Sequence, residues 1–172
     1  MRKGGSTYNF CVRVICFCVM LPVFAGTLSH SSAGTARGDD KTIAKPWTAA
    51  QEMRPAELAS ALSETKTRVT PTILYVGFRT LFIGGHIPGA TFHGTASTEA
   101  GLAELKKWAD TLPRSTNLVI YCGCCPFDHC PNIRPAFVAL REMGFTNLRV
   151  LVMPANFATD WVDKGYPIEK SA

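Results

Sequence analysis

The stretch of residues 117–135 reads NLVIYCGCCPFDHCPNIRP, and the rest of the chain is interpreted outward from it. It opens with a short apolar run, Leu118 to Tyr121, which predicts a buried β-strand. A loop with four cysteines and one histidine follows, and a helix is predicted from about Pro135 to Met143. A strand therefore carries Cys122 into a loop that ends at a helix N-terminus.

This arrangement has chemical consequences for Cys122. Free N–H groups and the dipole at a helix N-terminus favour an anion. A cysteine in such a place can have its pKa lowered from about 8.5 to roughly 3.5–7.5. We therefore interpret Cys122 as the catalytic thiol, and Gly123 and Arg134 as groups that bind an anionic substrate. The alternatives are a small buried residue at a strand end for Cys122 and a surface arginine for Arg134.

Three more cysteines share the loop and allow three interpretations. One of them could be a resolving or auxiliary thiol that forms a disulfide with Cys122. The loop could instead bind zinc or copper, although C-x-C-C-x4-C is not the usual C-x2-C zinc spacing. The third possibility is a structural disulfide between Cys125 and Cys130. The candidate auxiliary thiols are Cys124, Cys125 and Cys130, and the candidate metal ligands are Cys122, Cys124, Cys125, Cys130 and His129. Our main interpretation needs no cofactor.

The first 33 residues have the pattern of an export signal. Basic residues precede the apolar run 14–25, and small residues at 29–33 suggest cleavage before Gly34, with a cut after Ala25 as the alternative. An uncleaved anchor is the alternative, but the run is shorter than the ~20 residues that a membrane span needs. We expect a signal peptide at 1–33, a polar linker at 34–46 and one domain at 47–170. The protein is then periplasmic or secreted, with no stable membrane insertion after cleavage.

Charge excludes one class of partner. The chain of 172 residues has a formal net charge of +5, and Arg2, Lys3 and Arg13 in the leader supply part of it. The remaining residues are close to neutral. Nucleic-acid binding requires a basic patch or stripe. We therefore expect no nucleic acid as a partner.

Helical and strand patterns alternate along the predicted domain. Short helices are predicted at 55–65 and 156–163, and a longer one has its apolar stripe between Leu102 and Leu112, with Ser97 or Thr98 as its cap. Buried strands are predicted at 72–76 and 148–152. This alternation predicts an α/β fold with a central parallel sheet and helices on both faces. Ligands bind such sheets beyond the carboxyl ends of the strands, where the cysteine loop lies.

Four segments carry a resemblance to a known family. They are RPAEL at 54–58, GHIPGA at 85–90, the strand VIYC at 119–122 with the helix that ends at MGF, 143–145, and the closing segment from Phe157 to Pro167. Over roughly residues 47–169 the chain resembles the rhodanese-like sulfurtransferase domains. The loop after Cys122 is roughly five residues longer than the six-residue cradle of that family.

The resemblance implies a rhodanese-like fold and a function for Cys122. That residue would accept sulfane sulfur from a small donor such as thiosulfate or a persulfide, and pass it to an acceptor thiol or a redox partner protein. We therefore expect a sulfurtransferase or persulfide carrier. The alternatives are a thiol redox or metal-binding protein that works through the loop, and a non-catalytic interaction module.

Overall fold

A five-stranded parallel sheet organises the part of the chain that the computed structural model describes, residues 44–64 and 70–171. The strands lie in the order β1-β5-β4-β2-β3, and every pair is parallel. Their bounds are β1 (Glu52–Met53), β2 (Thr72–Tyr75), β3 (Ala90–Phe92), β4 (Leu118–Tyr121) and β5 (Leu148–Leu151). The predicted parallel sheet is confirmed, and the strand that precedes Cys122 is its central member.

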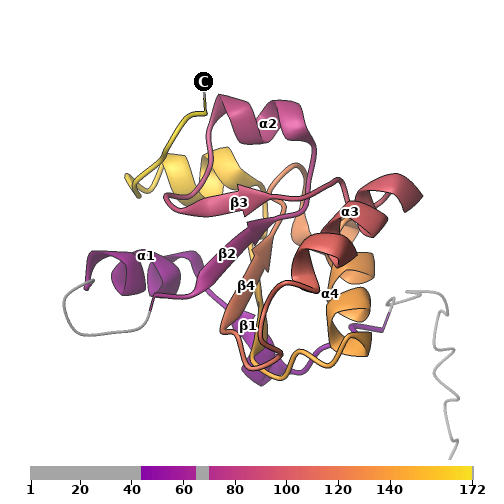
Figure 1. Ribbon diagram of the computed structural model, residues 1–172. Helices are drawn as coiled ribbons and strands as arrows, with labels where there is room; N and C mark the ends of the chain where they lie inside the picture. Colours follow the sequence, from indigo (N-terminus) through magenta and orange to yellow (C-terminus); the bar gives the residue numbers. More distant parts are fainter. Residues whose placement is uncertain (1–43, 65–69, 172) are drawn as a thin grey trace, which may run out of the picture. The chain divides into compact units, whose positions relative to one another are not determined.

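Helices cover both faces of this sheet, as predicted. In Figure 1, α3 and α4 lie together on one side and α1 lies on the other. The helices are α1 (Pro55–Ser63), α2 (Arg79–Gly84), α3 (Glu99–Ala109) and α4 (Ile133–Glu142), with 3-10 turns at Ala49–Gln51 and Phe127–His129 and a π-type turn at Ala158–Val162. The last turn is slightly shorter than the predicted helix 156–163. The Asn156 side-chain oxygen accepts the N–H of Thr159, and the Asp160 carboxylate accepts the N–H groups of Ala155 and Asn156, so both side chains cap its start.

The sequence of α3 explains its bounds. The Thr98 hydroxyl accepts a hydrogen bond from the N–H of Gly101 at 3.1 Å, so the predicted cap is confirmed. Acidic Glu99 lies in the first turn and basic Lys106 in the last, which suits the helix dipole. The apolar stripe faces the sheet, where Leu105 is fully buried. The helix is thereby fixed against the strands that lead to the cysteine loop.

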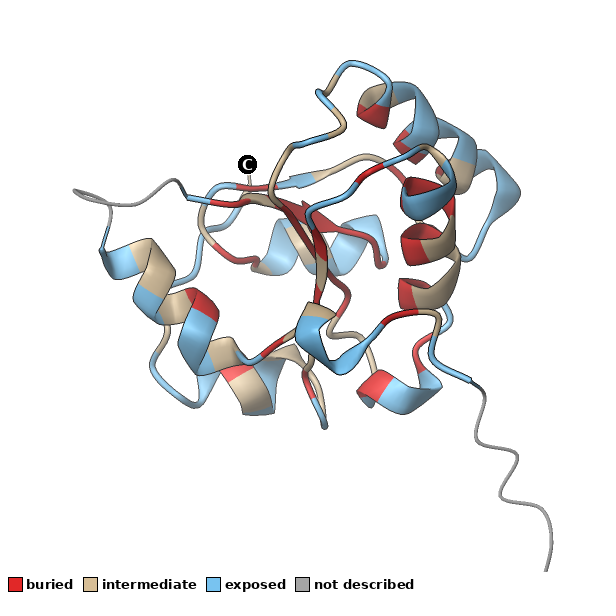
Figure 2. Cartoon of the chain, turned by 90° about the horizontal axis from the view of Figure 1, so that it is seen from below, coloured by how far each residue is buried: buried red, intermediate tan, exposed pale blue. Residues whose placement is uncertain are grey.

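Alternation along the strands divides the buried side chains between two cores. Ile120 and Cys122 belong to the core under α3 and α4. Tyr121 belongs to the core on the opposite face, together with Leu58 of α1 and the fully buried Trp161. Figure 2 shows the sheet as a buried band whose flanking helices are exposed on their outer sides. Side chains along a strand alternate between its two faces, so the side chain of Cys122 lies on the same face as that of Ile120, in the core that α4 covers.

Several predictions fall outside the described residues. The leader 1–33, the cleavage site before Gly34 and nearly all of the linker 34–46 are among them. Residues 65–69 and Ala172 are also not described. Among the helices at 44–64 and 70–171, none is long and apolar enough to cross a membrane. Export of the protein stays a prediction.

Candidate thiol site

Three sulfur atoms gather where β4 ends. The Sγ atoms of Cys122, Cys124 and Cys130 all lie within 4.8 Å of one another, and we call these residues the three-sulfur group. The Sγ atoms of Cys122 and Cys124 are 3.1 Å apart. Cys125 lies outside the group, but its Sγ is 3.4 Å from that of Cys124. All four are free thiols, so the predicted alternative of a disulfide between Cys125 and Cys130 is not found.

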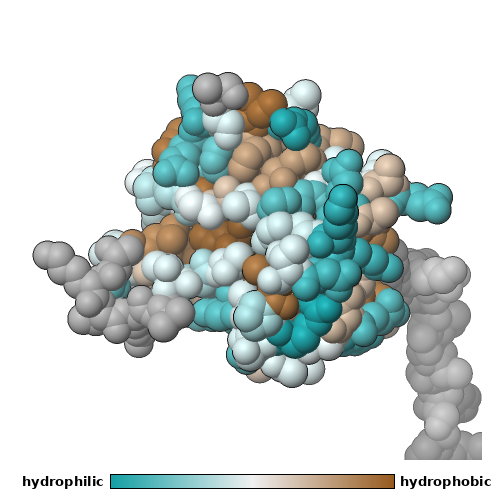
Figure 3. All heavy atoms as spheres, viewed as in Figure 1, coloured by the Kyte–Doolittle hydropathy of each residue, from teal (hydrophilic) through white to brown (hydrophobic). Residues whose placement is uncertain are grey.

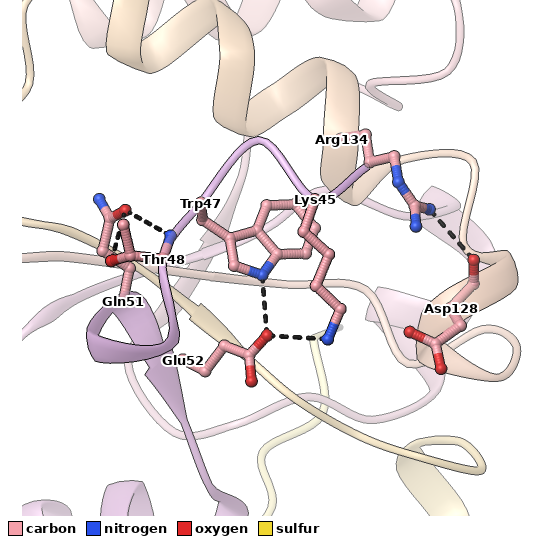
Figure 4. Close-up of polar contacts among 7 residues, drawn as sticks. All are labelled: Lys45, Trp47, Thr48, Gln51, Glu52, Asp128 and Arg134. Atoms are coloured by element: carbon pink, nitrogen blue, oxygen red, sulfur yellow. Dashed lines mark hydrogen bonds and ion pairs between the residues drawn. The ribbon is translucent and has the colours of Figure 1, made fainter. Parts of the chain in front are cut away.

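The long loop is held in place by aromatic packing. Phe127 is buried, and its ring lies 5.6 Å from that of Trp47, which also contacts Phe137 of α4 at 5.3 Å. The Trp47 indole donates to the Glu52 carboxylate at 3.0 Å, and Lys45 donates to the same carboxylate oxygen (Figure 4). The Lys45 hydrogen bond lowers the pKa of Glu52 below its ordinary value. Trp47 is therefore fixed from two sides, and it supports the middle of the loop.

The end of the loop brings Cys130 to the first turn of α4. Cys130 is buried, and the backbone amides of Asn132 and Ile133 lie against its sulfur. Pro135 falls in the first turn of the helix, where a missing N–H removes no intrahelical hydrogen bond. The anion-stabilising position that the sequence assigned to Cys122 is thus occupied by Cys130.

The acidities of the two buried cysteines follow from this placement. The hydrogen bond with Cys122 is the largest cause that lowers the pKa of Cys130 to about 6; burial opposes it, and the two backbone amides assist it. The hydrogen bond with Cys130 raises the pKa of Cys122, and burial and the charge of Cys130 raise it further. Burial also raises the pKa of Cys125 to about 12. The expectation that Cys122 is the ionised sulfur is therefore not met: the charge lies on Cys130.

Asn132 positions the three-sulfur group. Its side chain is fully buried, and its amide donates to Cys122 Sγ at 3.4 Å and to Cys124 Sγ at 4.0 Å. Its carbonyl oxygen accepts the N–H of Ser97 at 2.9 Å, which links the loop to the segment before α3. The sequence around Asn132 does not predict this role, because nothing in the local pattern shows that both ends of the side-chain amide form hydrogen bonds.

Substitution of Asn132 separates these two functions. We expect Asn132→Ala to lower the free energy of unfolding by about 1–3 kcal/mol, because it removes buried hydrogen bonds and leaves a void. Asn132→Asp keeps an acceptor for Ser97 but places a negative charge beside the sulfurs, so the pKa of Cys130 should rise. Urea unfolding and thiolate absorbance at 240 nm measure the two effects. A Cys130 pKa that is the same in Asn132→Asp and the wild type would contradict this assignment.

Gly77 allows Tyr75 and Cys122 to approach each other. A Cβ atom on Gly77 would lie 2.5 Å from Tyr75 Oη and 2.8 Å from Cys122 Sγ. Both atoms therefore face the backbone of Gly77, which follows β2 in the chain. The hydroxyl of Tyr75 is buried, and its proton has no acceptor among the described residues. Burial is the largest cause that raises the pKa of Tyr75, so the hydroxyl keeps its proton.

The side chain added by Gly77→Ala cannot be accommodated without movement. We expect it to lower the free energy of unfolding by about 1–3 kcal/mol and to displace the Cys122 sulfur, because the atoms it meets are themselves buried. Gly84→Ala is the matched control, since a Cβ at Gly84 has no neighbour within 4 Å. Urea unfolding of both variants tests this. Equal free energies of unfolding for the two variants would contradict this prediction, because they would show that Tyr75 and Cys122 move aside at little cost.

A cavity of about 510 Å³ opens beside the sulfurs at the carboxyl ends of the strands. Both Cys122 and Cys124 line it, and so do Tyr75 and Gly123. Gly123 has φ +71°, a conformation that favours glycine, and its carbonyl oxygen accepts the N–H of Phe157 at 2.9 Å. The predicted position of a ligand site beyond the strand ends agrees with this cavity.

Two residues predicted for the site lie away from the cavity. Arg134 Nη1 donates to the carbonyl oxygen of Asp128 at 3.1 Å (Figure 4). The guanidinium carbon lies 6.0 Å from the centre of the Trp47 ring. Arg134 does not line the cavity. His129 is exposed in the 3-10 turn and is not in the three-sulfur group. The structure thus brings together the cysteines and Gly123 but not Arg134 or His129.

The donor set at this site suits a soft metal ion. Three thiol sulfurs within 4.8 Å of one another could converge on zinc or cuprous copper, both of which accept thiolate ligands. Among the described residues this is the one group of three or more such donors. The same sulfurs can equally exchange protons and sulfur atoms among themselves. The arrangement therefore supports either thiol chemistry or soft-metal binding.

Comparison with known proteins identifies the fold. No family model and no curated protein matches the chain. Two solved structures that resemble it are a solution structure of the rhodanese-like domain of the Alr3790 protein from Anabaena sp. and a crystal structure of the same protein. The first has a TM-score of 0.52 at 22% identity and covers 70% of this chain and 80% of the other. For the second, the TM-score is 0.51 at 22% identity, with 69% and 91% covered.

These likenesses define the class of the described domain. The resemblance predicted from the sequence is confirmed, and the chain has the rhodanese-like fold. At this level of identity the shared property is the fold, so the chemistry of the site must be argued from its own residues.

Proposed function

We propose that this protein carries sulfane sulfur as a persulfide on Cys122 and transfers it to an acceptor thiol. The observation that supports this most directly is a pair of neighbouring sulfurs, Cys122 and Cys124, that line a cavity at the carboxyl ends of the strands. Cys130 supports it further, because its pKa of about 6 makes it a thiolate at neutral pH. The family resemblance of the sequence implies the same use in sulfur transfer for a cysteine at this strand end.

The reaction with a persulfide donor R–S–SH uses Cys130 as the base. The Cys122 sulfur attacks the terminal sulfur of the donor, its proton moves to the Cys130 thiolate, and R–S⁻ leaves. The products are Cys122–S–SH, protonated Cys130 and the thiolate of the donor. An acceptor R′–SH then attacks the outer sulfur of the persulfide, which regenerates the Cys122 thiol and yields R′–S–SH.

A side reaction is available to Cys124. Its sulfur, 3.1 Å from Cys122 Sγ, can attack that atom in the persulfide and release H₂S. The product is a disulfide between Cys122 and Cys124, which a reducing partner must then open. Cys124 would act in this step as the resolving thiol, one of the alternatives predicted for the loop cysteines.

Mass spectrometry tests the proposal. Reduced, desalted protein is incubated with a persulfide donor, and the intact mass and the peptide masses are compared before and after treatment. We expect a gain of one sulfur atom, located on Cys122 and removed by an acceptor thiol. An unmodified Cys122 with every donor would overturn the proposal.

Soft-metal binding is a second candidate function, favoured by the convergence of three sulfurs in one buried group. Zinc or cuprous copper would be held by Cys122, Cys124 and Cys130, without His129. Elemental analysis of protein purified without chelators should then give one metal per chain. Cys124→Ser should lower that ratio, and His129→Ala should leave it unchanged. A metal-free wild type that also fails to bind added zinc or cuprous ion would exclude this candidate.

A further inference from the structure

The cavity beside Cys122 has uncharged walls, which is unusual for a site that binds an anion. None of the described residues that line it carries a charged side chain. Leu81, Phe157, Val162 and Ile168 supply most of its apolar wall, and the neutral side chains of Thr80 and Asn156 are also present. A dianion such as thiosulfate would therefore lose its hydration here without meeting a cation.

Apolar side chains are also exposed at this cavity. Leu81 is 49% exposed, Val162 40% and Ile168 43%, although all three are large hydrophobic residues. Figure 3 shows hydrophobic residues on the outer surface in the region of α2, the helix that contains Leu81. Exposed apolar groups around a concave site indicate that an apolar ligand covers them. The cavity volume of about 510 Å³ suits a small molecule.

One polar group in the cavity still requires a partner. Tyr75 lines the cavity, and its buried hydroxyl finds no hydrogen-bond acceptor among the described residues. The Phe78 amide approaches its oxygen, but that contact would leave the hydroxyl proton unused. A buried donor without an acceptor is costly, and its presence indicates an acceptor brought by a ligand. Because Tyr75 Oη and Cys122 Sγ both face Gly77, that acceptor would be close to the reacting sulfur.

We infer that the cavity binds the apolar group of an organic persulfide R–S–SH, and that the Tyr75 hydroxyl donates a hydrogen bond to the sulfur that leaves as R–S⁻. This inference rests on the proposed function and names its donor. The protonated persulfide is uncharged, which suits walls without charge. As the S–S bond of the donor breaks, negative charge develops on the inner sulfur, and the hydroxyl stabilises it there. Tyr75 is then a catalytic residue, and Leu81, Val162 and Ile168 determine specificity.

The first experiment compares donors. Loading of Cys122 is timed with benzyl persulfide, glutathione persulfide and thiosulfate at equal concentrations. We expect benzyl persulfide to react about tenfold faster or more than the other two, since removing apolar contacts costs this much in a hydrophobic pocket. Equal rates for all three donors would overturn the inference and leave the proposed function standing. Loading by none of them would instead overturn the proposed function.

Binding without reaction is measured separately. Benzyl methyl sulfide has no transferable sulfur, so its binding, followed by NMR shifts, reports on the cavity alone. Leu81→Lys should weaken this binding about tenfold or more. Ile83→Lys is the matched control, because Ile83 is 39% exposed on the same helix but does not line the cavity. Absence of binding to the wild type, or equal effects of the two lysines, would overturn the inference even if sulfur transfer fails.

The role of the Tyr75 hydroxyl is tested by comparing persulfide donors whose leaving thiolates differ in stability. Tyr75→Phe keeps the ring that packs on Phe82 and Tyr121 and removes the donor. We expect kcat/KM for benzyl persulfide to fall roughly ten- to hundredfold. The loss should be smaller for phenyl persulfide, whose thiolate is a better leaving group and needs less stabilisation. A loss that is the same for both donors would assign Tyr75 a purely structural role.

A second tyrosine supplies the control for this test. The hydroxyl oxygen of Tyr121 accepts the N–H of Ile87 at 3.0 Å and does not line the cavity. Tyr121→Phe therefore removes a buried hydroxyl that already has a partner. It should lower stability without changing the ratio of the benzyl and phenyl rates. A change of that ratio in Tyr121→Phe as large as in Tyr75→Phe would contradict the assignment.

Discussion

Replacement of Cys122 by serine should abolish sulfur loading, with a fall in rate of about three orders of magnitude or more. The reason is that the serine hydroxyl is neither ionised nor able to form a persulfide. The fold should survive, because the substitution is nearly isosteric and Cys122 lies at the edge of the core, beyond the last residue of β4. Intact mass after donor treatment measures the loading, and urea unfolding checks the fold.

A matched control comes from the same loop. Cys125 is partly exposed and lies outside the three-sulfur group, so Cys125→Ser should retain most of the transfer activity. If Cys122→Ser loads sulfur on Cys124 or Cys130 at the wild-type rate, the acceptor has been assigned to the wrong cysteine. If Cys125→Ser loses activity as Cys122→Ser does, the loop as a whole rather than one sulfur is required.

Cys130→Ser should have the second large effect, on both charge and rate. The wild type should show one thiolate whose absorbance at 240 nm titrates near pH 6, because the pKa of Cys130 is lowered to about 6. The variant should lack it. Transfer at pH 7 should fall by about 10²-fold, since the base that accepts the Cys122 proton is gone. In the wild type the rate should decrease as the pH falls below about 6, where Cys130 becomes protonated.

The same titration decides which sulfur holds the charge. The structure places it on Cys130, and the hydrogen bond with Cys130 raises the pKa of Cys122. A thiolate that persists near pH 6 in Cys130→Ser and disappears in Cys122→Ser would restore the assignment made from the sequence.

Local sequence patterns were sufficient to predict the central strand, the helix α3 and the parallel sheet of this domain. The apolar run before Cys122 predicted the central strand, and the Thr98 cap and the stripe that includes Leu105 predicted α3. These features depend on neighbours in the chain, so a single sequence contains the information. The parallel sheet followed from the alternation of such elements, and the site beyond the strand ends followed from the sheet.

Contacts between distant segments could not be predicted in the same way. Asn132 reaches Ser97, and Tyr75 faces Cys122 across Gly77, yet no periodicity links these positions. Cys130 was considered an auxiliary thiol, because its burial at the first turn of α4 depends on the path of the loop. That path depends in turn on the contact between Phe127 and Trp47. Arg134 suited an anion site by residue type, but its guanidinium contacts the loop carbonyl of Asp128.

Because Phe127 packs on Trp47, the cysteine loop cannot be grafted onto another protein without this tryptophan. A protein engineer who grafts residues 122–132 onto another rhodanese-like scaffold would transfer all four thiols but not the indole that supports them. Without that indole, Phe127 would have no aromatic partner from the N-terminal segment, and Cys130 would lose its fixed approach to α4. The transplantable unit is therefore discontinuous, and it includes Trp47 together with its Glu52 acceptor.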